Sequence, residues 1–234
     1  MNNLVIGASS GIGEAVVKKL GGVAVARREE RLKQFKRYEL FDVSNLQDIE
    51  EFVKGIAKDY GKFDNLIFCA GVQNIKPLRV MKVDEIVQIF NINLISAMIF
   101  AKAFSSKKVS NANASMIFTS SIASYKPESG ILAYSASKAA LNNFIKAAAK
   151  ELSPIRVNGV APGFLKTEMT KKFSHIYTDD FIKNLDKNSP AGLANIDDVV
   201  DTIEFLINSN HITGEIITVD GGAVLWKFII LDMW

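Results

Sequence analysis

The sequence is short of the residues that build disulfides and metal sites. Its 234 residues include one cysteine, Cys69, and two histidines, His175 and His211. A single cysteine cannot form an intramolecular disulfide, so the usual marker of an oxidising compartment is missing. Three such residues far apart in the sequence also argue against a Cys/His zinc site. We therefore expect no metal, an apolar filling role for Cys69 rather than a redox role, and both histidines at the surface.

Long apolar runs and an excess of charge of one sign are also missing. The first ten residues lack the basic and apolar segments of a secretory signal, and Lys102 interrupts the longest candidate for a membrane helix. Lys and Arg number 28 against 25 Asp and Glu, a formal net charge of +3. That balance calls for neither nucleic acid nor a membrane as partner. These absences favour a cytoplasmic protein.

The apolar residues that are present alternate between two kinds of pattern. Hydrophobic residues make up 48% of the chain, and short β-rich runs alternate with helical spacing, which is typical of a parallel sheet with crossover helices. We expect strands at 3–7, 22–26, 38–43, 64–71, 114–121, 155–163 and 215–222. We expect helices at 14–20, 27–35, 45–60, 83–104, 132–152 and 197–208. The prediction is a single α/β domain over residues 1–234, a doubly wound, Rossmann-like parallel sheet of seven strands with helices on both faces.

A glycine-rich loop joins the first expected strand to the first helix. It reads GASSGIG from Gly7 to Gly13, and its glycines permit a tight turn and a close approach of backbone to a phosphate at a helix N-terminus. The spacing is not that of a P-loop. A plain strand-to-helix turn has the same motif, but its place in an alternating chain favours a nucleotide site. The candidate cofactor residues in this loop are Gly7, Ser9, Ser10, Gly11, Ile12 and Gly13.

Two arginines follow the second expected strand, at the position where a dinucleotide-binding protein discriminates between NAD(H) and NADP(H). An acidic residue there binds a ribose 2′-hydroxyl, whereas arginine accommodates a 2′-phosphate. The chain has Arg27 and Arg28 before its first acid, Glu29. This order favours NADP(H) over the alternative, NAD(H), with Arg27 as the main contact; the other reading is that both arginines begin a solvated helix. Asp42 and Val43, after the third strand, are expected to line the adenine.

A serine, a tyrosine and a lysine then suggest the chemistry. Tyr134 and Lys138 stand one helical turn apart, and Ser121 ends the fifth strand, where the carboxyl edge of the sheet forms the ligand crevice. Lys138 is expected to lower the pKa of Tyr134, which would exchange a proton while Ser121 polarises a substrate oxygen. Asn93, a polar residue within a long apolar helix, is expected to hold a water that relays the proton. This set suits hydride transfer to or from a carbonyl.

Taken together, these motifs resemble the short-chain dehydrogenase/reductase family. GASSGIG, ARR, DVS, CAG, NINL, TSSIA, YSASK, APGFLKT and ITGEIITVDGG follow in the family's order from Val5 to about Val224. The resemblance implies an NAD(P)-dependent oxidoreductase acting on an alcohol or carbonyl, and it implies a catalytic set of Asn93, Ser121, Tyr134 and Lys138. It also implies cofactor contacts by Tyr134, Lys138, Ala70, Gly71, Pro162, Gly163 and Thr167.

The sequence departs from the family pattern in two places. The family usually has threonine before the first glycine, where this chain has Ile6, and Asn-Asn-Ala-Gly after the fourth strand, where it has Phe68-Cys69-Ala70-Gly71. The lost groups are polar and help tie the central strands to the cofactor loop. The departures therefore bear on loop rigidity and cofactor affinity, and they leave room for a second class of function, a non-catalytic nucleotide-binding sensor or scaffold.

The least patterned segment lies late in the chain, at residues 164–190, and is called the lid below. Its aromatic residues Phe164, Phe173, Tyr177 and Phe181 are expected either to cover an apolar substrate or to belong to a helical hairpin packed on the core. The candidate substrates are a 3-oxoacyl thioester, a sugar or polyol, or another small ketone. The apolar tail LWKFIILDMW is expected to be buried between subunits of a homodimer or homotetramer.

Overall fold

The computed structural model describes residues 1–225, which form one seven-stranded sheet. Its strands are β1 Asn3–Ile6, β2 Val23–Ala26, β3 Tyr38–Leu40, β4 Phe63–Phe68, β5 Ser110–Thr119, β6 Arg156–Pro162 and β7 Ile216–Val219. The order is β3-β2-β1-β4-β5-β6-β7, and every neighbouring pair is parallel. The chain order therefore reverses between β1 and β4, which is the place where open parallel sheets bind ligands. The predicted doubly wound sheet is confirmed.

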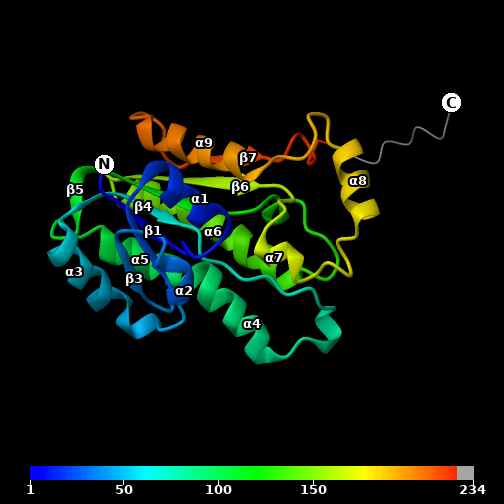
Figure 1. Cartoon of the computed structure of the whole chain (residues 1–234), viewed down its shortest axis with the longest axis horizontal. Helices are drawn as coiled ribbons and strands as arrows, with labels where there is room; N and C mark the ends of the chain where they lie inside the picture. The colour runs from blue at the N-terminus through cyan, green and yellow to red at the C-terminus, as the bar shows by residue number, and fades with distance from the viewer. Residues whose placement is uncertain (226–234) are drawn as a thin grey trace.

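Helices cover both faces of the sheet (Figure 1). They are α1 Gly11–Leu20, α2 Glu29–Leu32, α3 Ile49–Tyr60, α4 Val83–Phe90, α5 Ser96–Phe104, α6 Leu132–Glu151, α7 Glu168–Lys171, α8 Asp179–Lys187 and α9 Ile196–Asn208. α1 and α9 pack on one face of the sheet, and α3 and α5 pack on the other. A π-helical turn, Asn91–Ile95, joins α4 to α5.

The alternation of side chains along each strand divides the core into two halves. Leu4 and Ile6 of β1 pack with α3, α5 and α6, whereas Val5 packs with α1 and α9 on the opposite face. Both faces are apolar because a parallel sheet is covered on both sides. Each fully buried aliphatic side chain contributes about 1.5–3 kcal/mol to folding, so these two layers hold the strand ends in fixed positions.

Two predicted elements are shorter in the structure than in the sequence pattern. The helix expected at 27–35 is a single turn, α2, in which only Leu32 is buried, and β3 ends at Leu40 instead of residue 43. The charged residues around Leu32 offer no apolar stripe to pack on the sheet, and β3 is an edge strand paired only with β2. The chain that follows β3 therefore turns early and brings Asp42 to the sheet edge.

The long apolar segment 83–104 is a core helix by its contacts. Its length and composition alone would suit a membrane span, but Ala97, Phe100 and Phe104 are buried against the sheet and α3. The apolar tail falls outside the described residues except for Leu225.

Ile6 and Phe68, two residues at which the sequence departs from the family pattern, both pack in the apolar core. Ile6 and Phe68 are almost completely buried, and the Phe68 ring lies 5.8 Å from that of Phe100 and 6.0 Å from that of Phe118, measured between ring centroids. Such aromatic contacts stabilise beyond the area that they bury. The central strands are thus held together by hydrophobic contact at the positions where the polar groups are missing.

Candidate active site

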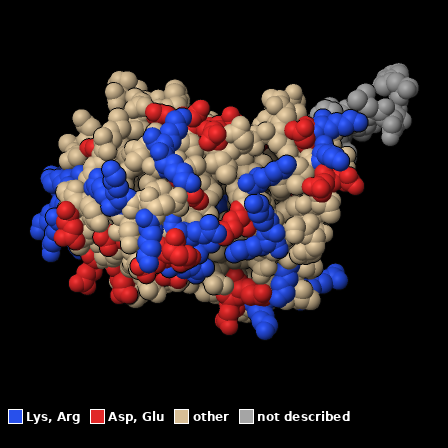
Figure 2. All heavy atoms as spheres, in the orientation of Figure 1, with Lys and Arg blue, Asp and Glu red and all other residues tan. Residues whose placement is uncertain are grey.

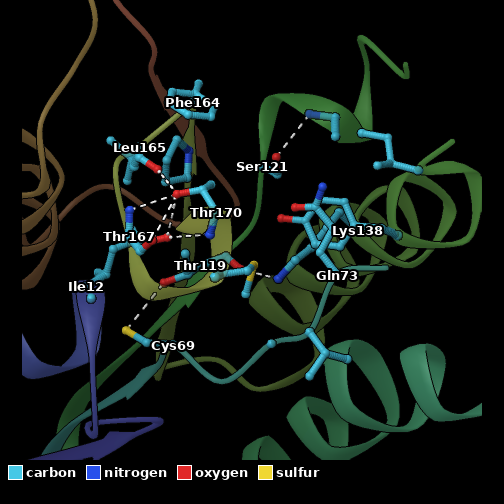
Figure 3. Close-up of a pocket in the computed structure, with 18 of the residues that line it drawn as sticks. Ile12, Cys69, Gln73, Thr119, Ser121, Lys138, Phe164, Leu165, Thr167 and Thr170 are labelled. Atoms are coloured by element: carbon cyan, nitrogen blue, oxygen red, sulfur yellow. Dashed lines mark hydrogen bonds between the residues drawn. The ribbon is translucent and has the colours of Figure 1, made fainter. Parts of the chain in front are cut away.

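A cavity of about 670 Å³ opens at the carboxyl edge of the sheet. It brings together most of the residues singled out in the sequence (Figure 3). Those candidate cofactor and catalytic residues that line it are Gly7, Ser9, Ser10, Gly11, Ile12, Arg27, Asp42, Val43, Ala70, Gly71, Ser121, Tyr134, Lys138, Pro162, Gly163 and Thr167. Gly13, Arg28 and Asn93 do not line the cavity, and each makes contacts behind its wall.

The glycine loop lies tightly against its neighbours. Gly7 has a φ of +86°, and a Cβ there would lie 2.6 Å from the backbone nitrogen of Ala70. A Cβ on Gly13 would lie 2.4 Å from the carbonyl oxygen of Gly7, so Gly13 lets α1 approach the loop. Ser10 stands at the N-cap of α1 without capping it through its side chain. The N–H groups of the first turn are therefore available to an anion in the cavity, as a dinucleotide's pyrophosphate requires.

The catalytic candidates stand together on the cavity wall. Tyr134 and Lys138 lie one turn apart on α6 and are 9% and 3% exposed, and Ser121 follows β5. Ser121 and Tyr134 line the same cavity. The Lys138 ammonium lies 5.8 Å from the centroid of the Tyr134 ring and donates a 2.8 Å hydrogen bond to the carbonyl oxygen of Thr119. The carboxyl edge of the sheet thus anchors the lysine through the carbonyl oxygen of Thr119.

Burial sets the protonation of this pair. Burial raises the pKa of Tyr134, although the hydrogen bond with Ser121 lowers it in part, and burial lowers the pKa of Lys138 to about 8. The direction for Tyr134 is opposite to the lowering that the sequence spacing predicts, because desolvation of the phenolate is the largest cause of the shift. At neutral pH the tyrosine is therefore protonated and the lysine is mostly charged, a state suited to giving a proton to a carbonyl oxygen.

Asn93 is a positioning residue in this structure. It lies fully buried in the π-helical turn. Its amide accepts from the Val72 N–H at 2.8 Å and donates to the Val72 carbonyl and to Ser137 Oγ, both at 3.0 Å. These bonds fasten the loop after β4 to α6, next to Tyr134. The water relay through Asn93 stays a prediction.

Several residues of the site carried no recognisable signal in the sequence. Asn142 accepts from Ser120 Oγ at 2.5 Å and donates to Ser124 Oγ at 2.8 Å, and Ser124 donates to the carbonyl of Ser121 at 2.6 Å. This network braces the segment that carries Ser121. The site also depends on a backbone carbonyl, that of Thr119, which no side-chain motif could reveal.

Cys69 also lines the cavity, beside Thr119. The Thr119 hydroxyl donates to its sulfur at 3.4 Å, and burial raises the pKa of the thiol to about 11. A thiol with a raised pKa is a poor nucleophile, which agrees with the predicted filling role. His175 and His211 are exposed, as expected.

The lid covers one side of the cavity with aromatic rings. Phe164, Tyr177 and Phe181 line the cavity, with the Tyr177 ring 5.1 Å from that of Phe164 and 5.5 Å from that of Phe181 between centroids. Phe173 contacts Tyr177 from outside the cavity lining. Neither α7 nor α8 contains a buried residue. These three rings therefore face the cavity, whereas Leu165 of the lid packs in the core. That the rings cover a substrate stays a prediction.

Charge is not concentrated on the face seen in Figure 2, where Lys and Arg alternate with Asp and Glu. Within residues 1–225, no group of three or more His, Cys, Asp or Glu side chains is placed to hold a metal ion.

Comparison with known proteins agrees with this site. Residues 7–224 match a family model described as enoyl-(acyl carrier protein) reductase. A human 3-oxoacyl-[acyl-carrier-protein] reductase is 34% identical over 187 residues, 79% of this chain and 76% of that protein. Carbonyl reductase family member 4 of Xenopus laevis is 32% identical over 235 residues, 94% of this chain and 97% of that protein. The chain belongs to the short-chain dehydrogenase/reductase family, and it is an oxidoreductase of the alcohol and carbonyl class.

Solved structures of the same fold cover nearly the whole chain. Ligand-free aldohexose dehydrogenase of Thermoplasma acidophilum superposes with a TM-score of 0.90 at 23% identity, over 97% of this chain and 95% of that one. A small-chain dehydrogenase in complex with NADPH gives 0.81 at 26% identity, over 97% and 99%. A 4-hydroxyisoleucine dehydrogenase complexed with NADH gives 0.86 at 26% identity, over 96% and 99%.

Proposed function

We propose that this protein is a nicotinamide-dependent reductase of a small ketone, with NADP(H) preferred over NAD(H). The observation that carries the proposal is the single cavity in which the glycine loop and the Ser121, Tyr134 and Lys138 side chains all take part. Relatives of similar length bind NADPH in one case and NADH in another, so a nicotinamide cofactor is supported and the choice between the two rests on this chain's own residues.

Ser121, Tyr134 and Lys138 each have a separate role in the proposed reaction. Reduced nicotinamide supplies a hydride when bound. Ser121 orients and polarises the substrate carbonyl, and Tyr134 gives its proton to the oxygen that becomes the alcohol. Lys138, charged and 5.8 Å from the Tyr134 ring centroid, stabilises the phenolate that the transfer leaves behind. The buried wall excludes water from this proton transfer.

The lid favours a substrate with an apolar part. Three aromatic rings of the lid, together with Ile75 and Ile176, face the same cavity, and apolar walls bind alkyl or aryl groups by excluding water. A 3-oxoacyl thioester or another ketone with an apolar chain therefore fits better than a sugar or polyol. The named activity of the human relative, a 3-oxoacyl reductase, supports the same choice.

A substrate panel tests this proposal. Purified protein is mixed with NADPH or NADH and with 3-oxoacyl thioesters of increasing chain length, simple ketones and sugars, and the absorbance of reduced nicotinamide is followed. We expect turnover of apolar ketones, with kcat/KM rising with chain length. Tight cofactor binding without turnover of any carbonyl would instead support the non-catalytic sensor.

The NADP(H) preference is tested at Arg27. This side chain is 63% exposed, lines the cavity and donates to Asp42 at 3.2 Å, so a 2′-phosphate can reach it. Arg27→Asp is expected to weaken NADPH binding by about tenfold or more and to leave NADH binding nearly unchanged. Equal effects on both cofactors would contradict the role of Arg27.

We also propose a homodimer or homotetramer that works in the cytoplasm. Exposed apolar side chains on α4 and α5, among them Val83, Val87 and Met98, support an association surface. The single cysteine supports a reducing compartment. Light scattering during size exclusion is expected to give a dimer or larger, and Val87→Glu to reduce it to a monomer. Cell fractionation tests the location.

A further inference from the structure

Both arginines at the adenosine end of the cavity already hold a carboxylate. Arg27 is paired with Asp42 at 3.2 Å, and Arg28 is paired with Glu168. The first pair joins the ends of two neighbouring strands. The second is different because Glu168 is the first residue of α7 in the lid, 140 positions along the chain from Arg28.

Arg28 binds Glu168 through both terminal nitrogens of its guanidinium group. Its Nη1 and Nη2 donate to the two carboxylate oxygens of Glu168, each at 2.8 Å. The same Nη2 donates to Ser9 Oγ at 2.9 Å and to Ser10 Oγ at 3.0 Å. Ser9 and Ser10 line the cavity but Arg28 does not. Glu168 therefore holds this guanidinium beside the cofactor cavity, where it contacts the hydroxyl groups of Ser9 and Ser10.

We propose that Glu168 determines cofactor specificity by competing with the 2′-phosphate of NADP(H) for Arg28. The inference rests on the proposed nicotinamide cofactor and names a residue of the lid that tunes the choice between its two forms. Glu168 would lower the affinity for NADP(H) and leave the affinity for NAD(H) nearly unchanged.

The chemistry of the two anions gives the reason. A guanidinium binds a carboxylate and a phosphate through the same pair of parallel N–H donors, so it cannot serve both at full strength. NADP(H) brings a phosphate to this end of the cavity and must displace Glu168 to engage Arg28. NAD(H) brings an uncharged ribose hydroxyl, which gains little from a free guanidinium. The displacement of Glu168 from Arg28 therefore weakens the binding of NADP(H) but not that of NAD(H).

The charge of Glu168 is present under all ordinary conditions. Hydrogen bonds from Arg28 and Ser10 lower the pKa of its carboxyl group to about 2, so it remains ionised at neutral pH. Its side chain is 37% exposed and that of Arg28 is 33% exposed. Water therefore screens the pair, and a phosphate can exchange with the carboxylate.

Cofactor titrations of Glu168→Gln test the competition. The dissociation constants of NADPH and NADH are measured by the fluorescence of the reduced nicotinamide, with no substrate present. We expect Glu168→Gln to bind NADPH about fivefold more tightly and to change NADH binding by less than about twofold. Asp180→Asn, which removes an equal charge from an exposed position of the lid, is the control and should change neither constant.

The same titrations in an Arg28→Ala background identify the partner. If Glu168 acts through Arg28, then Glu168→Gln should change the NADPH constant by less than about twofold once Arg28 is gone. Weaker NADPH binding in Glu168→Gln, or an equal change for both cofactors, would overturn the inference while leaving the proposed function intact. Failure of the wild-type protein to bind either cofactor would overturn both.

Discussion

Two walls of the same cavity differ in how the chain holds them. Tyr134 and Lys138 are buried on the long helix α6, and Ser121 is braced through Ser124 and Asn142 at the end of a central strand. The lid opposite has no buried residue in α7 or α8. Two side-chain contacts, Arg28 with Glu168 and Gln73 with Tyr177, tie it to the rest of the site.

The difference suggests that one wall carries out proton transfer and that the lid selects the substrate and the cofactor. Proton transfer needs groups fixed within a fraction of an ångström, and packed helices and strands supply that precision. Selecting a substrate or cofactor requires a surface whose conformation can change. Exposed segments with few buried contacts change conformation at a low cost in free energy. Changes to the catalytic wall should therefore act on kcat, and changes to the lid should act on binding.

The largest effect is expected at Tyr134. Tyr134→Phe removes the proton donor and keeps the ring, so kcat should fall by about 10³-fold while the cofactor dissociation constants stay unchanged. Tyr125→Phe is a matched control because Tyr125 is exposed and outside the cavity lining. Steady-state kinetics on the best ketone of the panel measure both. Near-normal turnover by Tyr134→Phe would contradict the role of the tyrosine.

The second effect is a dependence on pH through Lys138. Burial lowers its pKa to about 8, so its positive charge is present below that pH and is lost above it. The charge stabilises the phenolate of Tyr134, and carbonyl reduction should therefore slow above about pH 8, approaching tenfold for each further unit. A pH profile of kcat for reduction measures this limb. A rate that rises or stays level above pH 8 would refute this account of Lys138.

A smaller effect is expected at Asn142, which braces the catalytic wall without touching the cavity. Asn142→Ala removes the hydrogen bonds to Ser120 and Ser124, so kcat should fall by about fivefold with little change in KM. The neighbouring Asn143 is exposed, and Asn143→Ala should be silent. If both variants behave alike, or if only KM changes, the positioning role of Asn142 is wrong.

The smallest effect is expected from the lid. Phe181→Ala removes an aromatic ring that lines the cavity and is already 38% exposed, so KM for an apolar ketone should rise about threefold at constant kcat. Phe205→Ala, an exposed ring on α9, serves as the control. A fall in kcat with unchanged KM would mean that the lid takes part in the chemistry, and the contrast between the two walls would be lost.

The sequence predicted those parts that depend on local pattern. Short apolar runs in β1 and β4 and helical spacing in α3 and α6 predicted the strands, the helices and their order. The glycine loop and the Tyr134–Lys138 pair were recognisable because their function requires fixed spacing along the chain. The end of β3 and the single turn of α2 were harder to predict, since what decides them is a lack of packing partners at the sheet edge.

The remainder of the site depends on contacts between distant residues. Glu168 meets Arg28 across 140 positions, and Lys138 is anchored by the backbone carbonyl of Thr119. Neither contact leaves a periodic pattern in the sequence. The raised pKa of Tyr134 was also not predicted, because spacing along α6 reports a neighbouring cation but not the burial of the hydroxyl group.

The most direct measurement follows the hydride itself. The protein is supplied with a ketone of the panel and with reduced nicotinamide that carries deuterium on its transferable position, and the alcohol product is examined by mass spectrometry and NMR. The account predicts one deuterium on the carbinol carbon, and no labelled alcohol from Tyr134→Phe under the same conditions. An unlabelled carbinol carbon, or labelled alcohol formed at the wild-type rate by Tyr134→Phe, would contradict it.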